Sequence, residues 1–180
     1  MIAYKGMEPG MICRGYQLYM GRNTTPEANC QRNGFHCAAN PMDCLRYYGD
    51  FRHSEYYLVR PNGDLDEDAV DSRISCTELW VLRKLKPQEF FLHALAYMAD
   101  HPQMPDGCDV KRERAQAWNG YAVVRGKHPR AKGKLGDILA FARESVNGPE
   151  IEHLSLCVID GKERLPDTWY DDNFEECEAV

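Results

Sequence analysis

The sequence predicts an α+β fold, with a mostly antiparallel sheet, two helices and a glycine-rich β extension at the C-terminal end. Three observations lead to this prediction. Most apolar residues alternate with polar ones in short runs bounded by glycine or proline, as strands do. Only two segments carry apolar residues at helical spacing. The length of 180 residues and the hydrophobic share of 43% fit a compact globular chain with a core of its own.

The first third of the chain has the pattern of short strands joined by turns. Alternating or short buried apolar runs occur in the segments MIAYKGM, ICRGYQLYMG and GFHCA. The polar segment 21–33 contains a proline and predicts a loop. Each strand is therefore expected to be brief and to end at a glycine turn.

A short helix is predicted over residues 41–48. Asn40 is a favoured N-cap residue, and Pro41 suits the first helical position because its missing N–H has no helical partner there. Asp43 lies in the first turn, where an acidic side chain is favourable. Apolar residues then recur at three-to-four spacing until Gly49.

Two strands and the second helix follow. Residues 54–60 and 73–85 alternate, and the second run is rich in β-branched and bulky side chains, as a central strand is. The acidic segment 61–71 between them predicts a turn. Residues 87–99 form the clearest helix, with Pro87 at its start and an apolar stripe of Phe91, Ala94, Leu95 and Met98.

A break at residues 102–109 predicts the domain boundary, so that a main α+β domain spans 1–104 and a β-rich extension spans 105–180. Glycines 120, 126, 133 and 136 alternate with short apolar pieces, which indicates strands and turns rather than helix. Residues 151–170 are expected to close as a hairpin with Asp160-Gly161 as its turn.

No apolar run approaches the length of about 20 residues that a membrane span needs, and the start lacks the pattern of a signal peptide. We therefore expect a cytoplasmic protein with no membrane partner. In a reducing compartment the cysteines are expected to be thiols that pack as small hydrophobes. They are Cys13, Cys30, Cys37, Cys44, Cys76, Cys108, Cys157 and Cys177.

Charge is unevenly distributed along a chain whose net charge is −6. A basic stretch at 111–134 contains aromatic residues, and acidic clusters lie near residues 64–71 and 171–178. Solvated faces are the ordinary interpretation, and a surface that steers a charged partner or contacts phosphates is the sharper one. The candidate binding residues are Lys111, Arg112, Arg114, Trp118, Tyr121, Arg125, Lys127, Arg130, Lys132, Asp66, Glu67, Asp68, Asp171 and Asp172.

The dense segment 33–49 raises the question of a metal or catalytic site. Structural zinc sites draw ligands from paired, closely spaced knuckles, whereas Cys37 and Cys44 are separated by a helix start and no second knuckle exists. We therefore expect no metal. Cys37 next to His36 suggests a nucleophile and base, but neighbours on a strand point to opposite faces. Packing is the preferred interpretation.

YKG near the start, followed later by GFHCAANPMDCLRYY, resembles the frame of ADP-ribosyltransferase-type domains. That resemblance implies a nicotinamide dinucleotide pocket, with Tyr4-Lys5-Gly6 as its first element. The second element and the helix residues would be Gly34, Phe35, His36, Cys44 and Tyr47.

The catalytic glutamate of such a pocket would be Glu55 or Glu78. The sequence departs from the family, because Lys5 replaces an arginine and Ala38-Ala39 replace hydroxyl residues. Neither glutamate lies in a Glu-x-Glu motif.

Four segments, YKG, GFHCAANPMDCLRYY, AKGKLG and VIDGKERLPDTWY, resemble a group of phage- and prophage-borne proteins of unknown function. The resemblance implies a mobile-element origin and a host bacterial cell, and it brings no known catalytic residues and no cofactor. It lapses over residues 86–118.

Together these observations predict a non-catalytic protein that binds a host protein or a protein–nucleic-acid complex. The sharpest form is an inhibitor of bacterial immunity of the anti-CRISPR type. Two alternatives stay open: an ADP-ribosyltransferase-like enzyme, and a nucleic-acid-binding module that uses residues 111–134. The oligomeric state is not predicted.

Overall fold

The computed structural model describes residues 1–30, 32–68, 71–107 and 109–178. The chain forms two compact units, Met1–Phe90 and Phe91–Val180. The domain boundary predicted after residue 104 stays a prediction, because compactness does not show that either unit folds on its own. Cys108, one of the expected thiols, lies outside the described residues, as does part of the acidic segment 61–71.

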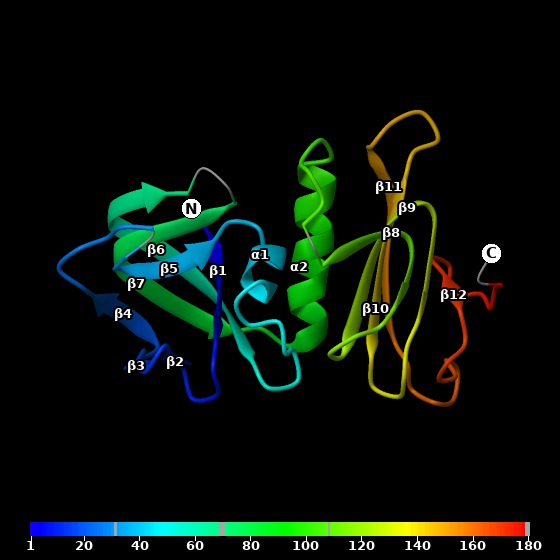
Figure 1. Cartoon of the computed structure of the whole chain (residues 1–180), viewed down its shortest axis with the longest axis horizontal. Helices are drawn as coiled ribbons and strands as arrows, with labels where there is room; N and C mark the ends of the chain where they lie inside the picture. Colours follow the sequence, from blue (N-terminus) through cyan, green and yellow to red (C-terminus); the bar gives the residue numbers. More distant parts are fainter. Residues whose placement is uncertain (31, 69–70, 108, 179–180) are drawn as a thin grey trace. The chain divides into compact units, whose positions relative to one another are not determined.

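Four strands of the first unit close into a ring (Figure 1). β1 (Ala3–Met7) pairs with β5 (Phe35–Ala38) and with β6 (Glu55–Glu67), and β7 (Arg73–Lys84) pairs with both β5 and β6. All four pairings are antiparallel. The β1–β5 pairing is brief, with Tyr4 opposite Ala38, and closure leaves no free edge along the paired stretches.

Two smaller pieces complete the sheet structure of this unit. β4 (Gly21–Thr24) pairs with residues 78–81 of β7, and β2 (Ile12–Cys13) and β3 (Tyr16–Gln17) form a two-stranded hairpin. The core within the ring includes Met7, Val59 and Leu79, which are fully buried. Burying an aliphatic side chain of this size contributes about 1.5–3 kcal/mol.

The two expected helices are present. α1 (Met42–Leu45) is a single turn, and α2 (Pro87–Asp100) is the long one. The Glu89 carboxylate accepts a hydrogen bond from the Lys86 N–H at 2.8 Å, which satisfies a backbone donor at the start of α2. The predicted apolar stripe of α2 is confirmed, since Phe91, Ala94, Leu95 and Met98 are all buried.

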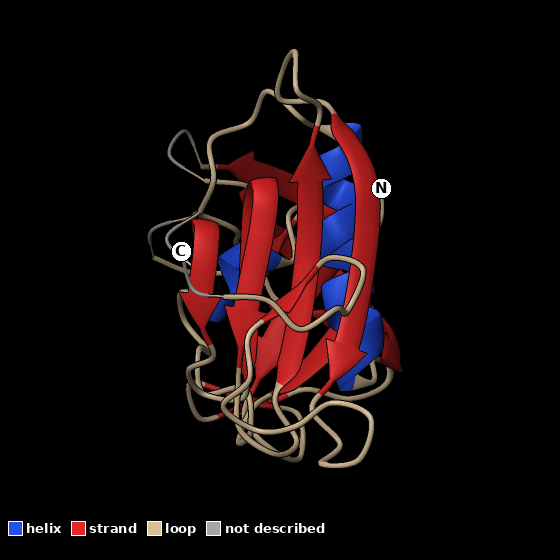
Figure 2. Cartoon of the chain, turned by 90° about the vertical axis from the view of Figure 1, so that its right-hand side faces the viewer, coloured by secondary structure: helices blue, strands red, loops and turns tan. Residues whose placement is uncertain are grey.

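The second unit is built on one sheet (Figure 2). Its order is β11 (Ile151–Val158), β10 (Ile138–Glu144), β9 (Tyr121–Lys132) and β12 (Tyr170–Asp171), and β8 (Val110–Gln116) also pairs with β9. β10 runs parallel to β9 and antiparallel to β11. Its core contains Val124, Leu139, Phe141 and Ile159.

The predicted α+β class is wrong, because 48% of the residues lie in strands and only 10% in helices, and the strands form several sheets. The protein is mostly β. The mostly antiparallel pairing and the two helices were predicted correctly. The class was misjudged because the first helix ends after four residues and because strands occupy polar segments that contain no apolar alternation.

Three segments that were predicted to be loops or turns have a different structure. β4 lies inside the polar segment 21–33, and β6 continues through the acidic segment as far as Glu67. β6 does so by an irregularity around Gly63, whose φ of 73° suits glycine. Asp160-Gly161 is not a hairpin turn, since Asp160 instead accepts backbone N–H bonds from Lys162, Glu163 and Arg164. Among the described residues, no helix is long and apolar enough to cross a membrane.

Candidate functional site

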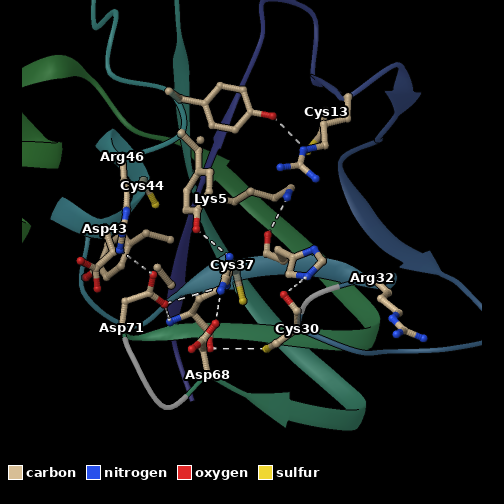
Figure 3. Close-up of a pocket in the computed structure, with 18 residues that line it drawn as sticks. Lys5, Cys13, Cys30, Arg32, Cys37, Asp43, Cys44, Arg46, Asp68 and Asp71 are labelled. Carbon is tan, nitrogen blue, oxygen red and sulfur yellow. Dashed lines mark hydrogen bonds and ion pairs between the residues drawn. The ribbon is translucent and has the colours of Figure 1, made fainter.

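A cavity of about 440 Å³ lies in the first unit and is lined by residues of β1, β5, α1 and the start of β7 (Figure 3). Small-molecule sites in proteins commonly have volumes of this order. Buried residues, including Lys5, Cys37 and Cys44, form its inner part. Exposed residues, including Arg14, Arg32 and Tyr47, lie at its mouth.

The dense segment 33–49 supplies one side of this cavity. The Asn40 side-chain oxygen accepts a hydrogen bond from the Met42 N–H at 3.1 Å, where α1 begins. The turn brings Tyr48 against β1 so closely that a Cβ on Gly6 would lie 2.8 Å from the tyrosine ring. Gly6 is therefore needed for this packing, and the cap and the glycine together position the helix over the strand.

Lys5 is the charged residue at the inner end of the cavity. It is only 4% exposed, and its Nζ donates a hydrogen bond to the His36 carbonyl oxygen at 2.5 Å (Figure 3). Among the described residues it makes no ion pair with a carboxylate. A buried ammonium group normally has a charged partner, because removing it from water is costly.

His36 lies beside Lys5 on β5. Its Nε2 lies 3.1 Å from the carbonyl oxygen of Cys30, so the neutral ring can donate a proton there. Burial lowers the pKa of His36, and the Lys5 charge lowers it further. The imidazole is therefore held neutral near pH 7 and adds no positive charge to the cavity.

An ion-pair network holds the side of the cavity formed by β7. Arg73 bonds to the Asp68 carboxylate and donates to the Tyr47 hydroxyl at 2.6 Å. Asp71 pairs with Arg46 at 3.5 Å. Asp43 accepts hydrogen bonds from the N–H and hydroxyl of Ser72 at 3.1 and 2.6 Å. The three acidic residues that line the cavity are thus engaged with partners other than Lys5.

The thiols near the cavity are packed rather than reactive. Burial raises the pKa of Cys44 to about 12. The hydrogen bond to Cys76 raises the pKa of Cys37 and lowers that of Cys76, and burial raises that of Cys37 further. A nucleophilic cysteine needs a depressed pKa and access to solvent, and Cys37 has neither.

The described cysteines are free, and no group of three or more His, Cys, Asp or Glu side chains among the described residues could hold a metal ion. Cys30 illustrates how these residues are used instead. Its N–H donates to the Asp66 carboxylate at 2.8 Å, and its thiol lies 2.6 Å from the Asp66 carbonyl oxygen. Cys30 therefore connects the loop before β5 to β6.

The residues implied by the transferase resemblance divide into two groups. Tyr4, His36 and Tyr47 line the same cavity, together with Lys5, Gly6 and Cys44. The two candidate glutamates do not line it. Glu55 pairs with Lys84 at 2.5 Å and Glu78 pairs with Arg22 at 2.6 Å. The cavity thus has the aromatic and imidazole groups of the frame without its carboxylate.

The basic stretch 111–134 lies in the second unit, and much of its charge is used within the protein. Arg112 and Arg125 both bond to Glu144, and Arg125 is 3% exposed. The Lys127 ammonium donates to the Val146 carbonyl oxygen, and Arg130 donates to that of Glu178. These two carbonyl bonds satisfy donors without neutralising charge.

The other candidates of this stretch vary in exposure. Lys132 lies over the ring of Trp169 at 5.3 Å, Tyr121 is buried, and Trp118 is 78% exposed. Lys111 and Arg114 are exposed residues of β8. The basic stretch 111–134 therefore offers fewer available cations than its sequence suggests.

The acidic candidates also have local roles. Asp68 is part of the Arg73 network, and Asp172 is buried against Arg143 and His153 at 2.9 and 2.8 Å. Asp171 accepts the N–H bonds of Asn173 and Glu175. Glu67 is an exposed residue at the end of β6, as is Asp66 near it.

Sequence reasoning missed several residues of the cavity. Arg73 was assigned only to a strand, Arg14 to a strand pattern and Arg32 to a polar loop, yet all three line the cavity. Among the described residues, Arg14 and Arg32 have no hydrogen-bond or ion-pair partner. The sequence held one hint, because these arginines lie near the expected YKG and GFHC strands. That they meet at one cavity, however, depends on the closing of the strand ring.

The fold and the cavity define a small closed-ring β module with a positively charged pocket. The chain belongs to the family described as a domain of unknown function (DUF7666), whose model matches residues 1–93. The match includes every residue that lines the cavity. No curated protein and no solved structure matches the chain.

Proposed function

We propose that the chain is a phage or prophage accessory protein that binds a host macromolecule in the bacterial cytoplasm and acts without catalysis. Its sharpest form is an inhibitor of bacterial immunity of the anti-CRISPR type. The order of motifs from YKG to PDTWY supports the mobile-element origin. The absence of either candidate glutamate from the cavity lining favours binding over catalysis.

The observation that carries this proposal is an exposed, largely aromatic surface on the β2–β3 hairpin and on the two residues before β4, which we call the hairpin surface. Tyr16, Tyr19 and Met20 are 52%, 66% and 54% exposed, and Arg14 is exposed beside them. The Tyr16 ring packs edge-on against buried Phe35 at 5.4 Å, which fixes it in place. Tyrosine and arginine are among the residues that protein interfaces use most as anchors, so a host protein is the partner this surface fits best.

The test is inhibition of CRISPR nuclease effectors from candidate hosts. The purified chain should co-elute with one effector and reduce its cleavage of target DNA. Replacing Tyr19 and Met20 together by serine should weaken inhibition at least about tenfold, because interface anchors of this kind each contribute 1 kcal/mol or more. These side chains are exposed, so the variant should keep the melting temperature of the parent.

Trp118→Ser is the matched control, since Trp118 is an exposed aromatic residue of the second unit. It should inhibit as the parent does. Failure of the chain to bind or inhibit any effector would refute the anti-CRISPR form of the proposal. If only the Trp118 variant loses inhibition, the partner binds the second unit rather than the hairpin surface.

The second candidate is an ADP-ribosyltransferase-like enzyme, favoured by Tyr4, His36 and Tyr47 lining one cavity. Such an enzyme would bind a nicotinamide dinucleotide, and ligand binding would raise the melting temperature. It would also release nicotinamide in the presence of bacterial proteins, and Glu55→Gln or Glu78→Gln would abolish the release. No nicotinamide release by the parent chain would remove this candidate.

A further inference from the structure

Within the part of the chain that the structure describes, the ammonium group of Lys5 lacks the charged partner that its burial demands. The hydrogen bond it makes there goes to the His36 carbonyl oxygen, and the residue is 4% exposed. A carbonyl oxygen satisfies one of the three ammonium donors and carries no full negative charge. Buried charges in proteins are normally paired, so this site has an electrostatic deficit in the unliganded chain.

The groups around Lys5 do not supply the missing charge. The thiols of Cys37 and Cys44 have raised pKa values and stay protonated near pH 7. Asp68 is bound to Arg73, Asp71 to Arg46, and Asp43 to Ser72. Burial also raises the pKa of Cys30, and the Cys13 sulfur accepts a hydrogen bond from the Tyr48 hydroxyl at 3.1 Å. Cys76, whose pKa is lowered by its hydrogen bond with Cys37, does not line the cavity.

The mouth of the cavity adds further positive charge. Arg14 and Arg32 line it, are exposed, and have no hydrogen-bond or ion-pair partner in the described part of the chain. With Arg46 and Arg73, five cationic residues line the cavity against three acidic ones. The field inside it therefore favours an anion, and forked arginine side chains are well suited to phosphate oxygens.

The size of the cavity limits the identity of the anion. A volume of about 440 Å³ exceeds what a single phosphate group needs, and Tyr4, Tyr47 and Tyr48 line the remaining space. Tyr47 is 46% exposed, and its ring is positioned by the bond from Arg73 to its hydroxyl. Aromatic walls beside a cationic end suit a planar ring attached to a phosphate.

We infer that this cavity binds a nucleoside monophosphate, with its phosphate at Lys5 and its base against the tyrosines. This inference goes beyond the proposed function, because the exposed residues Tyr16, Tyr19 and Met20 do not line the cavity. Arg14 is shared by the hairpin surface and the mouth of the cavity. The phosphate has two sources with the same chemistry: a free nucleotide, and the 5′-phosphorylated end of a nucleic acid.

The experiment is calorimetric titration of the full chain with AMP, adenosine and inorganic phosphate. AMP should bind, adenosine should bind at least about tenfold more weakly because it lacks the charge-assisted bonds, and inorganic phosphate should compete with AMP. A 5′-phosphorylated oligonucleotide and its unphosphorylated twin distinguish the two sources: tighter binding of the phosphorylated one assigns a nucleic-acid end, and no difference between the twins assigns the free nucleotide. Equal binding of AMP and adenosine would overturn the inference, as would no binding by any phosphorylated probe.

Lys5→Met tests the anchor, and Lys86→Met is its control, since Lys86 is an exposed lysine of the same unit. The first variant should lose AMP affinity at least tenfold and the second should not. Without ligand, Lys5→Met should melt at the same or a higher temperature, because methionine fills a similar volume without a buried charge. A large fall in melting temperature would show that the lysine is already satisfied and would contradict the inference.

The double variant Arg14→Ala with Arg32→Ala keeps the test decisive if Lys5→Met does not fold. Both side chains are exposed and unpaired among the described residues, so folding should be unaffected. AMP affinity should fall by roughly twofold to tenfold with a weaker salt dependence. Unchanged affinity would contradict a role for the mouth of the cavity. Lys5→Met should still inhibit the effector, because Lys5 is buried in the cavity and is no part of the hairpin surface, so the two proposals fail separately.

Discussion

Lys5 in the first unit and Arg125 in the second are buried to nearly the same degree, at 4% and 3% exposure, but their surroundings differ. Arg125 bonds to Glu144, to Asp106 and to the carbonyl oxygens of Pro102 and Pro149. In the described part of the chain, Lys5 bonds to one carbonyl oxygen, that of His36. Arg125, with its partners complete, serves the fold, whereas Lys5, which has no charged partner among the described residues, is the anchor that we propose for a ligand.

The same contrast holds for the charges around these two residues. The second unit has the denser basic sequence, yet Arg112 and Arg125 share the Glu144 carboxylate. The first unit has scattered cations, yet Arg14 and Arg32 meet at one cavity without partners among the described residues. Cation density along the chain is therefore a poor guide to where an anion binds.

The largest expected effect comes from breaking the Glu144 network. Glu144→Gln should reduce the free energy of unfolding by about 3 kcal/mol, because two guanidinium groups, one of them buried, lose their carboxylate. Urea unfolding measures the change. Glu163→Gln is the control, since the Glu163 side chain is 80% exposed and its ion pair among the described residues is with its neighbour Arg164. If Glu144→Gln leaves the free energy of unfolding unchanged, the partners of Arg125 do not stabilise the fold, and the contrast with Lys5 is lost.

A smaller effect is expected at the packing contact beside Lys5. Gly6→Ala should cost about 1–3 kcal/mol, because the new Cβ would lie 2.8 Å from the Tyr48 ring and the helix turn must shift. Gly107→Ala is the control, since nothing lies within 4 Å of a Cβ there. Thermal unfolding compares the two variants. If Gly6→Ala melts like the parent, close packing of α1 on β1 is not what shapes the cavity.

The smallest effect is a pH dependence at His36. Its pKa in the folded chain lies below the value near 6.5 of the unfolded chain, because of burial and the Lys5 charge. The unfolded state therefore binds the proton more readily, and this contribution to stability is complete above pH 6.5 and lost as pH falls toward the folded-state pKa.

His36→Gln should flatten the stability profile between pH 7 and pH 5, and the exposed residue His128 provides the control variant His128→Gln. Melting temperatures across that range measure both. A profile for His36→Gln as steep as that of the parent would show that the imidazole is protonated without cost. Lys5 would then be less isolated than its contacts suggest.

The local elements were largely predictable. The strand at YKG, the strand at GFHC and the helix beginning at Pro87 are present because alternation, glycine turns and capping residues act over a few neighbours. The prediction failed where tertiary pairing overrides local pattern. Residues 21–24 and 61–67 are polar, yet they are strands because β7 supplies a partner for their backbone groups.

The candidate cavity was predictable only in part. Tyr4, His36 and Tyr47 were identified through a resemblance, and the structure places them around one cavity. Arg73 and Arg32 were not identified, because nothing local distinguishes them from other surface arginines. The two glutamates were plausible on strand position alone, and their ion pairs with Lys84 and Arg22 depend on strand register.

By itself the sequence determined the short strands, the two helix starts and the uneven distribution of charge, because these follow from neighbouring residues and composition. Only the tertiary structure decided which charges are paired. Lys5 and His36 are 31 residues apart, and Arg125 and Glu144 are 19 apart. Whether a cation meets a carboxylate or a carbonyl oxygen depends on the closing of a ring or the register of a sheet, and those long-range contacts separate a structural charge from one that awaits a ligand.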